Sequence, residues 1–153
     1  MITTVRHTGI VVSNMREAHQ FYVEWLQCGR VVFDGVVCND YIDAVSGLKD
    51  VRLHIVMLEL PDGTRVELLE YLSHPRPTQG MQESCAVGCS HVALQVDDIE
   101  VAYKRLSRQG VKFHTPPRVD PQGYAKVTYC RGPDNVILEL VQVLKPGNTP
   151  YSK

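Results

Sequence analysis

The stretch PDGTRVEL at residues 61–68 occurs a second time, with substitutions, as PDNVILEL at residues 133–140. Both copies begin with a turn signal, because Asp accepts local hydrogen bonds and Gly or Asn tolerates a positive φ. Both continue into a β-rich run in which a Glu lies between apolar residues, at Glu67 and at Glu139. Another apolar run precedes each turn, so each copy predicts two consecutive strands of a meander.

A second repeated stretch lies upstream, as HTGIVVSNM at residues 7–15 and HVALQVDDI at residues 91–99. Each begins with His, alternates as a strand does, and then reaches polar residues that open a helix. Asn14 and Asp97, each with a Glu three residues later, match the capping box. The chain is therefore expected to contain one unit twice, formed by a strand, a helix and about three further strands.

This repeat predicts an α+β fold in a single domain that contains two tandem βαβββ modules. We place module 1 at about residues 4–72 and module 2 at about residues 89–144, with a linker at 73–88 and a flexible tail at 145–153. The distance from His to Glu is 60 residues in the first copy (7 to 67) and 48 in the second (91 to 139). We assign the surplus to an extended loop at residues 34–50, since loops accept insertions at little cost.

The composition is that of an ordinary globular chain, with 44% apolar and 22% charged residues in 153. The net charge of −1 offers no field for nucleic acid or an anionic membrane, so neither is expected as a partner. The first residues do not match a signal peptide, and no apolar run approaches the roughly 18 residues of a membrane span. We therefore expect a cytoplasmic protein.

The five cysteines do not form a recognisable pattern. They are odd in number and irregularly spaced, which is typical of reduced thiols. Cys85 and Cys89 lie four residues apart, but a second Cys or His pair that would complete a zinc finger is missing. We interpret the cysteines as small buried side chains without an assigned role: Cys28, Cys38, Cys85, Cys89 and Cys130.

Polar residues repeated in register carry more information than a repeated apolar core. His7 and His91 occupy equivalent positions in the first strand of each copy, and Glu67 and Glu139 do so in the last. A carboxylate within an apolar strand is costly unless it is paired or binds a metal. If the two copies pack together, two imidazoles and two carboxylates suit Zn²⁺, Ni²⁺, Co²⁺, Mn²⁺ or Fe²⁺. The alternative is that each of the four is an ordinary surface or hydrogen-bonded residue.

The phrases HTGIVV, PDGTRVELLEY, HVALQVDD and GPDNVILELVQ resemble the vicinal oxygen chelate superfamily over about residues 4–144. Its members include glyoxalase I, methylmalonyl-CoA epimerase, extradiol dioxygenases and the fosfomycin- and bleomycin-resistance proteins, and this chain resembles a small glyoxalase-like member. The resemblance implies curved mixed sheets around a metal site, with four ligands: His7, Glu67, His91 and Glu139. It also implies a homodimer, in which the ligands come from one chain or from two.

The same resemblance implies a metal-dependent lyase or isomerase of the glyoxalase or epimerase type. Such an enzyme binds a small substrate with vicinal oxygens and removes an α-proton to form an enediolate, with Glu139 or Glu67 as the base. One alternative is an Fe(II) extradiol dioxygenase, although two His and two Glu favour proton transfer over oxygen activation. Another is a non-catalytic binding or antibiotic-resistance protein of the same fold. The substrate (glutathione hemithioacetal, acyl-CoA or catechol) and the metal stay open.

His54 lies in an apolar strand run and is a candidate second base. The competing interpretation is a satisfied core or edge histidine. His19, His74 and His114 are expected at the surface.

Overall fold

The computed structural model describes residues 1–74, 80–88 and 90–145. The chain divides into two compact units, Met1–Gln79 and Gly80–Lys153, which we call module 1 and module 2. The division falls within the linker expected at residues 73–88. Cys89 and parts of the expected linker and tail lie outside the described residues. In the described part of the chain, none of the helices has the length and apolar character needed to cross a membrane.

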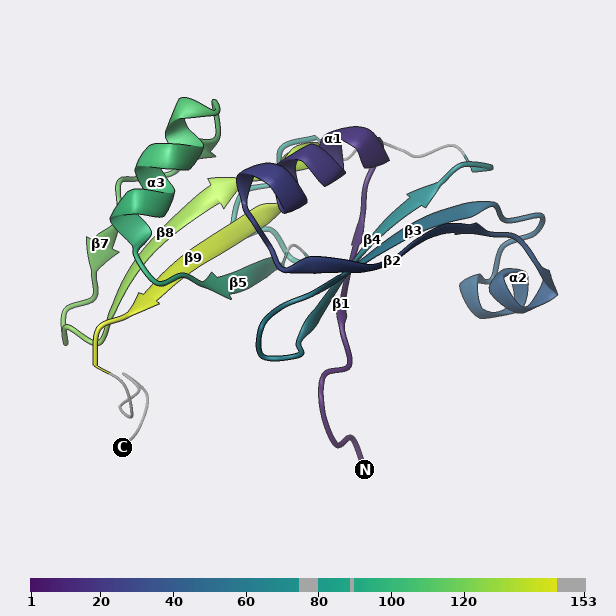
Figure 1. Cartoon of the computed structure of the whole chain (residues 1–153), viewed down its shortest axis with the longest axis horizontal. Helices are drawn as coiled ribbons and strands as arrows, with labels where there is room; N and C mark the ends of the chain where they lie inside the picture. The colour runs from purple at the N-terminus through teal and green to yellow at the C-terminus, as the bar shows by residue number, and fades with distance from the viewer. Residues whose placement is uncertain (75–79, 89, 146–153) are drawn as a thin grey trace. The chain divides into compact units, whose positions relative to one another are not determined.

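Module 1 contains a four-stranded mixed sheet in the order β1-β4-β3-β2 (Figure 1). β1 runs parallel to β4, and the other neighbours are antiparallel. The sheet therefore confirms the expected order of a strand, a helix and a three-stranded meander. Its strands are β1 (Thr8–Val11), β2 (Arg30–Val37), β3 (Leu53–Glu59) and β4 (Arg65–Tyr71).

Module 2 repeats this topology in the order β5-β9-β8-β6, with β5 parallel to β9. Two short strands that both pair with β8 stand where module 1 has the long edge strand β2. The sequence Pro133–Asn135 forms a short 3₁₀ turn, η2, before β9. The strands are β5 (His91–Gln95), β6 (Lys112–Phe113), β7 (Arg118–Val119), β8 (Ala125–Arg131) and β9 (Ile137–Val143).

Each sheet has one face against its helix and one face turned the other way. In β4, Leu68 is buried and Glu70 accepts a hydrogen bond from the backbone N–H of Met15, at the start of the helix. In β9, Leu140 is buried and Gln142 accepts in the same way from Ile99. We call this side the helix face. Since side chains alternate along a strand, Glu67 and Glu139 belong to the opposite face.

The helix that follows the first strand of each module begins after a residue whose side chain caps it. α1 (Met15–His19) starts after Asn14, whose Oδ1 accepts from the N–H groups of Arg16 and Glu17, so the expected cap is confirmed. The chain continues as a π-helix, η1 (Gln20–Trp25). The cap expected at Asp97 is wrong by one residue.

The cap of α3 (Ile99–Arg108) is Asp98, which is extended and accepts from the N–H groups of Glu100 and Val101. Asp98 stands seven residues after His91, as Asn14 stands seven residues after His7, so the two caps occupy equivalent positions of the repeat although the box pattern points to Asp97.

The extended loop expected at residues 34–50 is also wrong. Residues up to Val37 continue β2, and a second helix, α2 (Asp40–Ser46), follows. Asn39 caps this helix, and Gly47 ends it with a φ of 70°. The carboxylate of Asp43 accepts from two N–H groups beyond the helix, at 2.8 and 2.9 Å, and so fixes the return to β3.

The cysteines divide into two classes. Cys28 and Cys130 are buried, and burial raises the pKa of their thiols to about 11 and about 12. Cys38 and Cys85 are exposed. The interpretation as small buried side chains is therefore correct for two of the four described cysteines.

Candidate metal centre

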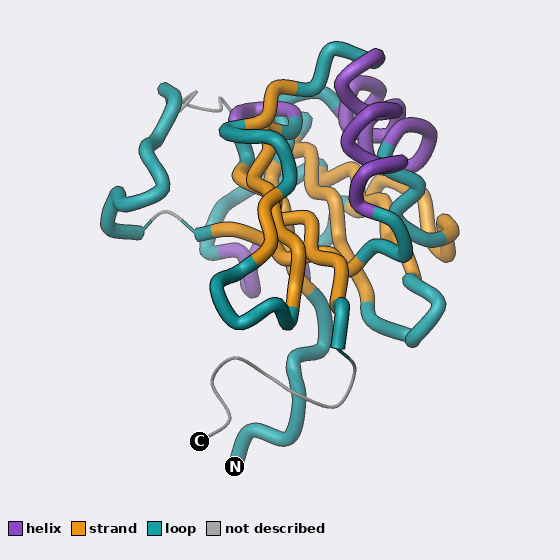
Figure 2. Tube along the Cα trace, turned by 90° about the vertical axis from the view of Figure 1, so that its left-hand side faces the viewer, coloured by secondary structure: helices purple, strands orange, loops and turns teal. Residues whose placement is uncertain are grey.

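Module 1 brings His7 and Glu67 together on the face opposite its helix. The parallel register of β1 and β4 places Gly9 beside Glu67, and His7 lies two residues earlier on the same side. The imidazole Nε2 of His7 and a carboxylate oxygen of Glu67 are 3.4 Å apart. His7 itself precedes β1, at the end of a loop segment that starts at the N-terminus (Figure 2).

Module 2 repeats this pair with the same offsets. The parallel register of β5 and β9 places Ala93 beside Glu139, and His91 lies two residues earlier. The distance between His91 Nε2 and Glu139 Oε2 is 3.1 Å. His91 is the first residue of β5, so its backbone, unlike that of His7, is held within the strand ladder. The structure thus brings together one His and one Glu of the four predicted ligands within each module.

Burial differs between the two kinds of side chain. The carboxylates are recessed, with 17% of the Glu67 side chain and 19% of the Glu139 side chain exposed. The imidazoles are more accessible, at 39% for His7 and 45% for His91. A recessed carboxylate beside an accessible imidazole is suited to binding a ligand from solvent. The carboxylate is already partly desolvated in the folded chain, so binding adds little further desolvation cost.

The donor atoms fit a divalent metal ion. Two ligand atoms that each lie about 2.1 Å from one ion, at an angle of roughly 90–109°, are about 3.0–3.4 Å apart. Both observed N···O distances, 3.4 and 3.1 Å, are compatible with that range.

Within each module, the described residues offer this pair and no third His, Cys, Asp or Glu that would complete a metal-binding group. Two protein ligands hold a divalent ion weakly, whereas structural and catalytic sites use three or four. Each module therefore presents half of the expected ligand set.

Sequence reasoning missed Tyr129, which is the cross-strand neighbour of Glu139. Its ring packs edge to face against the ring of His91, with centroids 5.2 Å apart, and against the ring of His114 at 5.9 Å. The expectation that His114 is a surface residue is correct, but it also has this aromatic neighbour. Counting strand positions from Glu139 would have indicated Tyr129 only if the register between β8 and β9 were known.

His54 lies on the helix face of module 1, so it is not beside His7 and Glu67. Its Nε2 lies 2.7 Å from Asp34 Oδ1 of β2, and its Nδ1 lies 3.8 Å from Glu70 Oε2 of β4. The structure favours the interpretation as a satisfied histidine over that as a second base for the His–Glu site.

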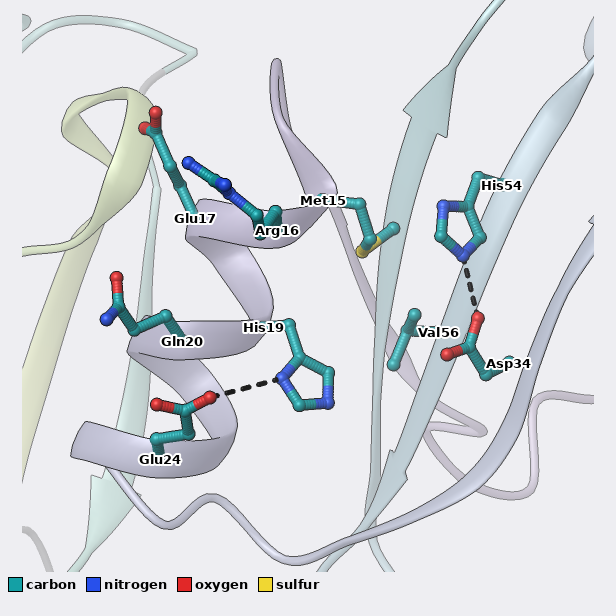
Figure 3. Close-up of a pocket in the computed structure, with 9 residues that line it drawn as sticks. All are labelled: Met15, Arg16, Glu17, His19, Gln20, Glu24, Asp34, His54 and Val56. Atoms are coloured by element: carbon teal, nitrogen blue, oxygen red, sulfur yellow. Dashed lines mark hydrogen bonds and ion pairs between the residues drawn. The ribbon is translucent and has the colours of Figure 1, made fainter.

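His54 also lines a cavity of about 520 Å³ between η1, α1 and the strands. In Figure 3, His19 projects toward this cavity from the helix and His54 from the sheet, each with a carboxylate beside it. The cavity is therefore polar and lies on the other side of the sheet from the His7–Glu67 pair.

Comparison with known proteins agrees with this architecture. Residues 4–140 match the family described as the glyoxalase/bleomycin resistance protein/dioxygenase superfamily. The uncharacterised protein YaeR of Escherichia coli K12 is 36% identical over 75 residues, which cover 49% of this chain and 57% of that protein. The chain thus spans little more than half the length of this curated relative.

Two solved structures illustrate the breadth of the fold. A glyoxalase family protein from Bacillus cereus superposes with a TM-score of 0.83 at 23% identity, covering 95% of this chain and 97% of that one. A fosfomycin resistance protein from Listeria monocytogenes superposes with a TM-score of 0.60 at 19% identity, covering 93% and 94%. These likenesses establish the fold. From the match over residues 4–140, the chain belongs to the glyoxalase/bleomycin resistance protein/dioxygenase superfamily.

Proposed function

We propose that this protein is a metal-dependent lyase or isomerase of the glyoxalase or epimerase type. The observation that carries the proposal is the duplicated pair, in which His7 meets Glu67 and His91 meets Glu139 at ligand-compatible distances. A structural ion pair needs no counterpart in the other module. A four-ligand metal site needs both.

The proposed site joins the two half-sets around one divalent ion, Zn²⁺, Ni²⁺, Co²⁺, Mn²⁺ or Fe²⁺. The half-sets come from one chain or from two copies in the expected homodimer. When bound, the ion supplies Lewis acidity toward a substrate that carries vicinal oxygens.

The protein residues then hold the ion and move a proton. In both pairs Nε2 is the ring nitrogen beside the carboxylate, so Nε2 is the imidazole atom that would hold the ion. Glu139 or Glu67 accepts the α-proton of the substrate, and their similar burial gives neither an advantage as the base. Two carboxylates also balance the charge of a dication.

Metal content tests the proposal directly. We expect about one divalent ion per intact set of four ligands in protein purified without chelator, measured by mass spectrometry of the metals. Glu67→Gln and Glu139→Gln should each weaken binding by about 100-fold, since each removes a charged ligand. Glu70→Gln is the matched control, because Glu70 lies on the same strand as Glu67 but on the helix face. Loss of metal in all three variants, or in none, contradicts the proposal.

Mixing of subunits tests the origin of the ligands. One variant loses the module 1 pair (His7→Ala with Glu67→Gln), and the other loses the module 2 pair (His91→Ala with Glu139→Gln). If the ligands come from two chains, dimers formed from both variants regain one intact site and its metal. If they come from one chain, mixing restores nothing.

The reaction is tested with metal-loaded protein and three substrates. The proposed proton-transfer chemistry predicts turnover of methylglyoxal–glutathione hemithioacetal or of methylmalonyl-CoA. Oxygen uptake with catechols on the iron-loaded protein would instead identify an extradiol dioxygenase. Full metal occupancy with none of these reactions would favour a binding or resistance protein.

A further inference from the structure

The two histidines of the proposed site are held to different degrees. His7 is reached through a loop and precedes its strand, whereas His91 is part of β5. Even so, the His91 side chain is 45% exposed, so its ring has room to turn about χ2. An imidazole binds a metal well only when its nitrogen points at the ion, and a neighbouring group usually fixes that orientation.

Tyr129 occupies the position from which the ring of His91 can be fixed. It pairs with Glu139 across the strands, so it rises from the sheet on the same face as the proposed ligands. The rings of His91 and Tyr129 meet at 65° with centroids 5.2 Å apart, the geometry of a favourable edge-to-face contact.

Tyr129 is itself held on its other side. The ring of His114 packs against it at 5.9 Å and 62°, and the N–H of His114 donates to the backbone carbonyl of Tyr129. The three rings thus form a row on one face of module 2, with Tyr129 in the middle. A ring held between two neighbours is a firmer support than one held by a single contact.

Module 1 has a different residue in this position. Met57 pairs with Glu67 as Tyr129 pairs with Glu139, so Met57 is the counterpart of Tyr129. A thioether chain has three rotatable bonds and adapts to its surroundings without fixing them. His7 therefore lacks both the strand backbone and the aromatic neighbour that His91 has in these positions.

We propose that Tyr129 is a positioning residue that holds the His91 imidazole in its ligating orientation, which makes module 2 the preordered half of the metal site. The proposal rests on the proposed function, because it assigns His91 to a metal. It predicts that removing the Tyr129 ring weakens metal binding although Tyr129 supplies no ligand atom. An edge-to-face contact of this kind corresponds to about threefold to tenfold in an equilibrium constant.

The experiment compares Tyr129→Met, which installs the module 1 residue, with Tyr129→Phe, which keeps the ring. Zn²⁺ affinity is measured by competition with a chromophoric chelator, and the absorption spectrum of the Co²⁺ form reports the ligand geometry. We expect Tyr129→Met to weaken Zn²⁺ binding about threefold to tenfold and to alter the Co²⁺ spectrum. Tyr129→Phe should restore both.

Tyr124→Met is the matched control. Tyr124 directly precedes β8 and contacts the Lys145 ammonium group, 5.4 Å from its ring. If Tyr129→Met and Tyr124→Met have the same metal affinity and the same Co²⁺ spectrum, the proposal is overturned. Thermal unfolding of the metal-free variants shows whether a change in affinity comes from loss of folding.

A readout on metal-free protein separates this proposal from the proposed function. In the NMR spectrum, the ring current of Tyr129 should shift the His91 ring resonances, and the shift should disappear in Tyr129→Met but persist in Tyr129→Phe. Wild-type protein that binds no Zn²⁺ would sink the proposed function, and the NMR result would still decide on the positioning of His91. His91 resonances that are unchanged in Tyr129→Met overturn the positioning role.

Discussion

The two modules share a His and a Glu on the face of the sheet opposite the helix, whereas the charged and polar residues on the helix face differ. On the face opposite the helix, each has a His and a Glu at matching positions. On the helix face, His54 of β3 pairs in register with Glu70, whereas Lys126 of β8 pairs with Gln142. The comparison teaches that the repeat keeps residue identity at the four positions of the proposed ligand set.

At the charged and polar positions of the helix face, each module forms similar contacts with different residues. His54 meets Asp34 of the neighbouring strand β2, while Lys126 forms an ion pair with Glu100 of the helix α3. Glu70 and Gln142 both accept a hydrogen bond from the first N–H of the helix. Both a carboxylate and an amide oxygen supply the acceptor that the N–H at a helix N-terminus requires.

The largest effects should come from the equivalent core leucines. Leu68 and Leu140 are fully buried at corresponding positions of β4 and β9. Leu68→Ala or Leu140→Ala should each lower the free energy of unfolding by about 2–5 kcal/mol, because each leaves a cavity. Urea unfolding measures the loss. Amide hydrogen exchange should show most of the lost protection in the module that carries the substitution.

Equal loss of protection in both modules for either leucine would contradict this expectation. It would mean that the two modules unfold as one cooperative unit. The modules would then differ in their side-chain chemistry but not in their stability.

An intermediate effect is expected where the strand meets the helix N-terminus. Glu70→Ala and Gln142→Ala should each cost about 1 kcal/mol in unfolding free energy, because an N–H at the start of a helix loses its acceptor. Glu70→Gln installs the module 2 residue in module 1 and keeps the acceptor, so it should cost less than about 0.5 kcal/mol. Thermal or urea unfolding measures all three. A loss in Glu70→Gln as large as that in Glu70→Ala would show that the charge, not the acceptor, matters in module 1.

The smallest effect concerns the connections that lead into β3 of module 1 and β8 of module 2. In module 1, Asp43 accepts hydrogen bonds from backbone N–H groups between α2 and β3. In module 2, Asp120 accepts from the N–H groups of Ala125 and Gln122 and so stabilises the turn before β8. Several hydrogen bonds lower the pKa of the Asp120 carboxyl below its usual range, and the one from the N–H of Ala125 has the largest effect. A carboxyl whose pKa is lower in the folded chain than in the unfolded chain stabilises the fold at a pH above the pKa of the unfolded chain. This stabilisation is lost as the pH falls through the pKa of the folded chain.

Asp120→Asn should therefore lower stability at pH 7, and the difference from wild type should shrink as the pH falls from about 5 to about 3. Urea unfolding at pH 7 and at pH 3 measures the difference in unfolding free energy between the variant and wild type. A difference that is the same at pH 7 and pH 3 would show that ionisation of Asp120 contributes nothing.

Residues whose local neighbours decide their structure could be predicted from the sequence. The Pro-Asp turns, the strands on either side of them and the cap at Asn14 depend on a few adjacent residues, and the structure has them. The segment at residues 34–50 could not be predicted in this way. Its Gly, Asn and Asp residues are typical of loops, but Asn39 and Gly47 act here as the two ends of a helix, and Asp43 closes it onto β3.

For this protein, the sequence by itself determined the repeat and the mixed α+β fold and indicated His7, Glu67, His91 and Glu139 as proposed ligands, because duplication leaves two similar pairs of stretches that can be aligned along the chain. Only the tertiary structure decided which side chains lie next to that set. Tyr129 lies against His91, and His54 lies on the helix face, away from the proposed ligands. Both placements follow from the pairing register of the strands, which fixes the neighbours of a residue and the face it occupies. That register depends on long-range backbone hydrogen bonds, which local sequence does not encode.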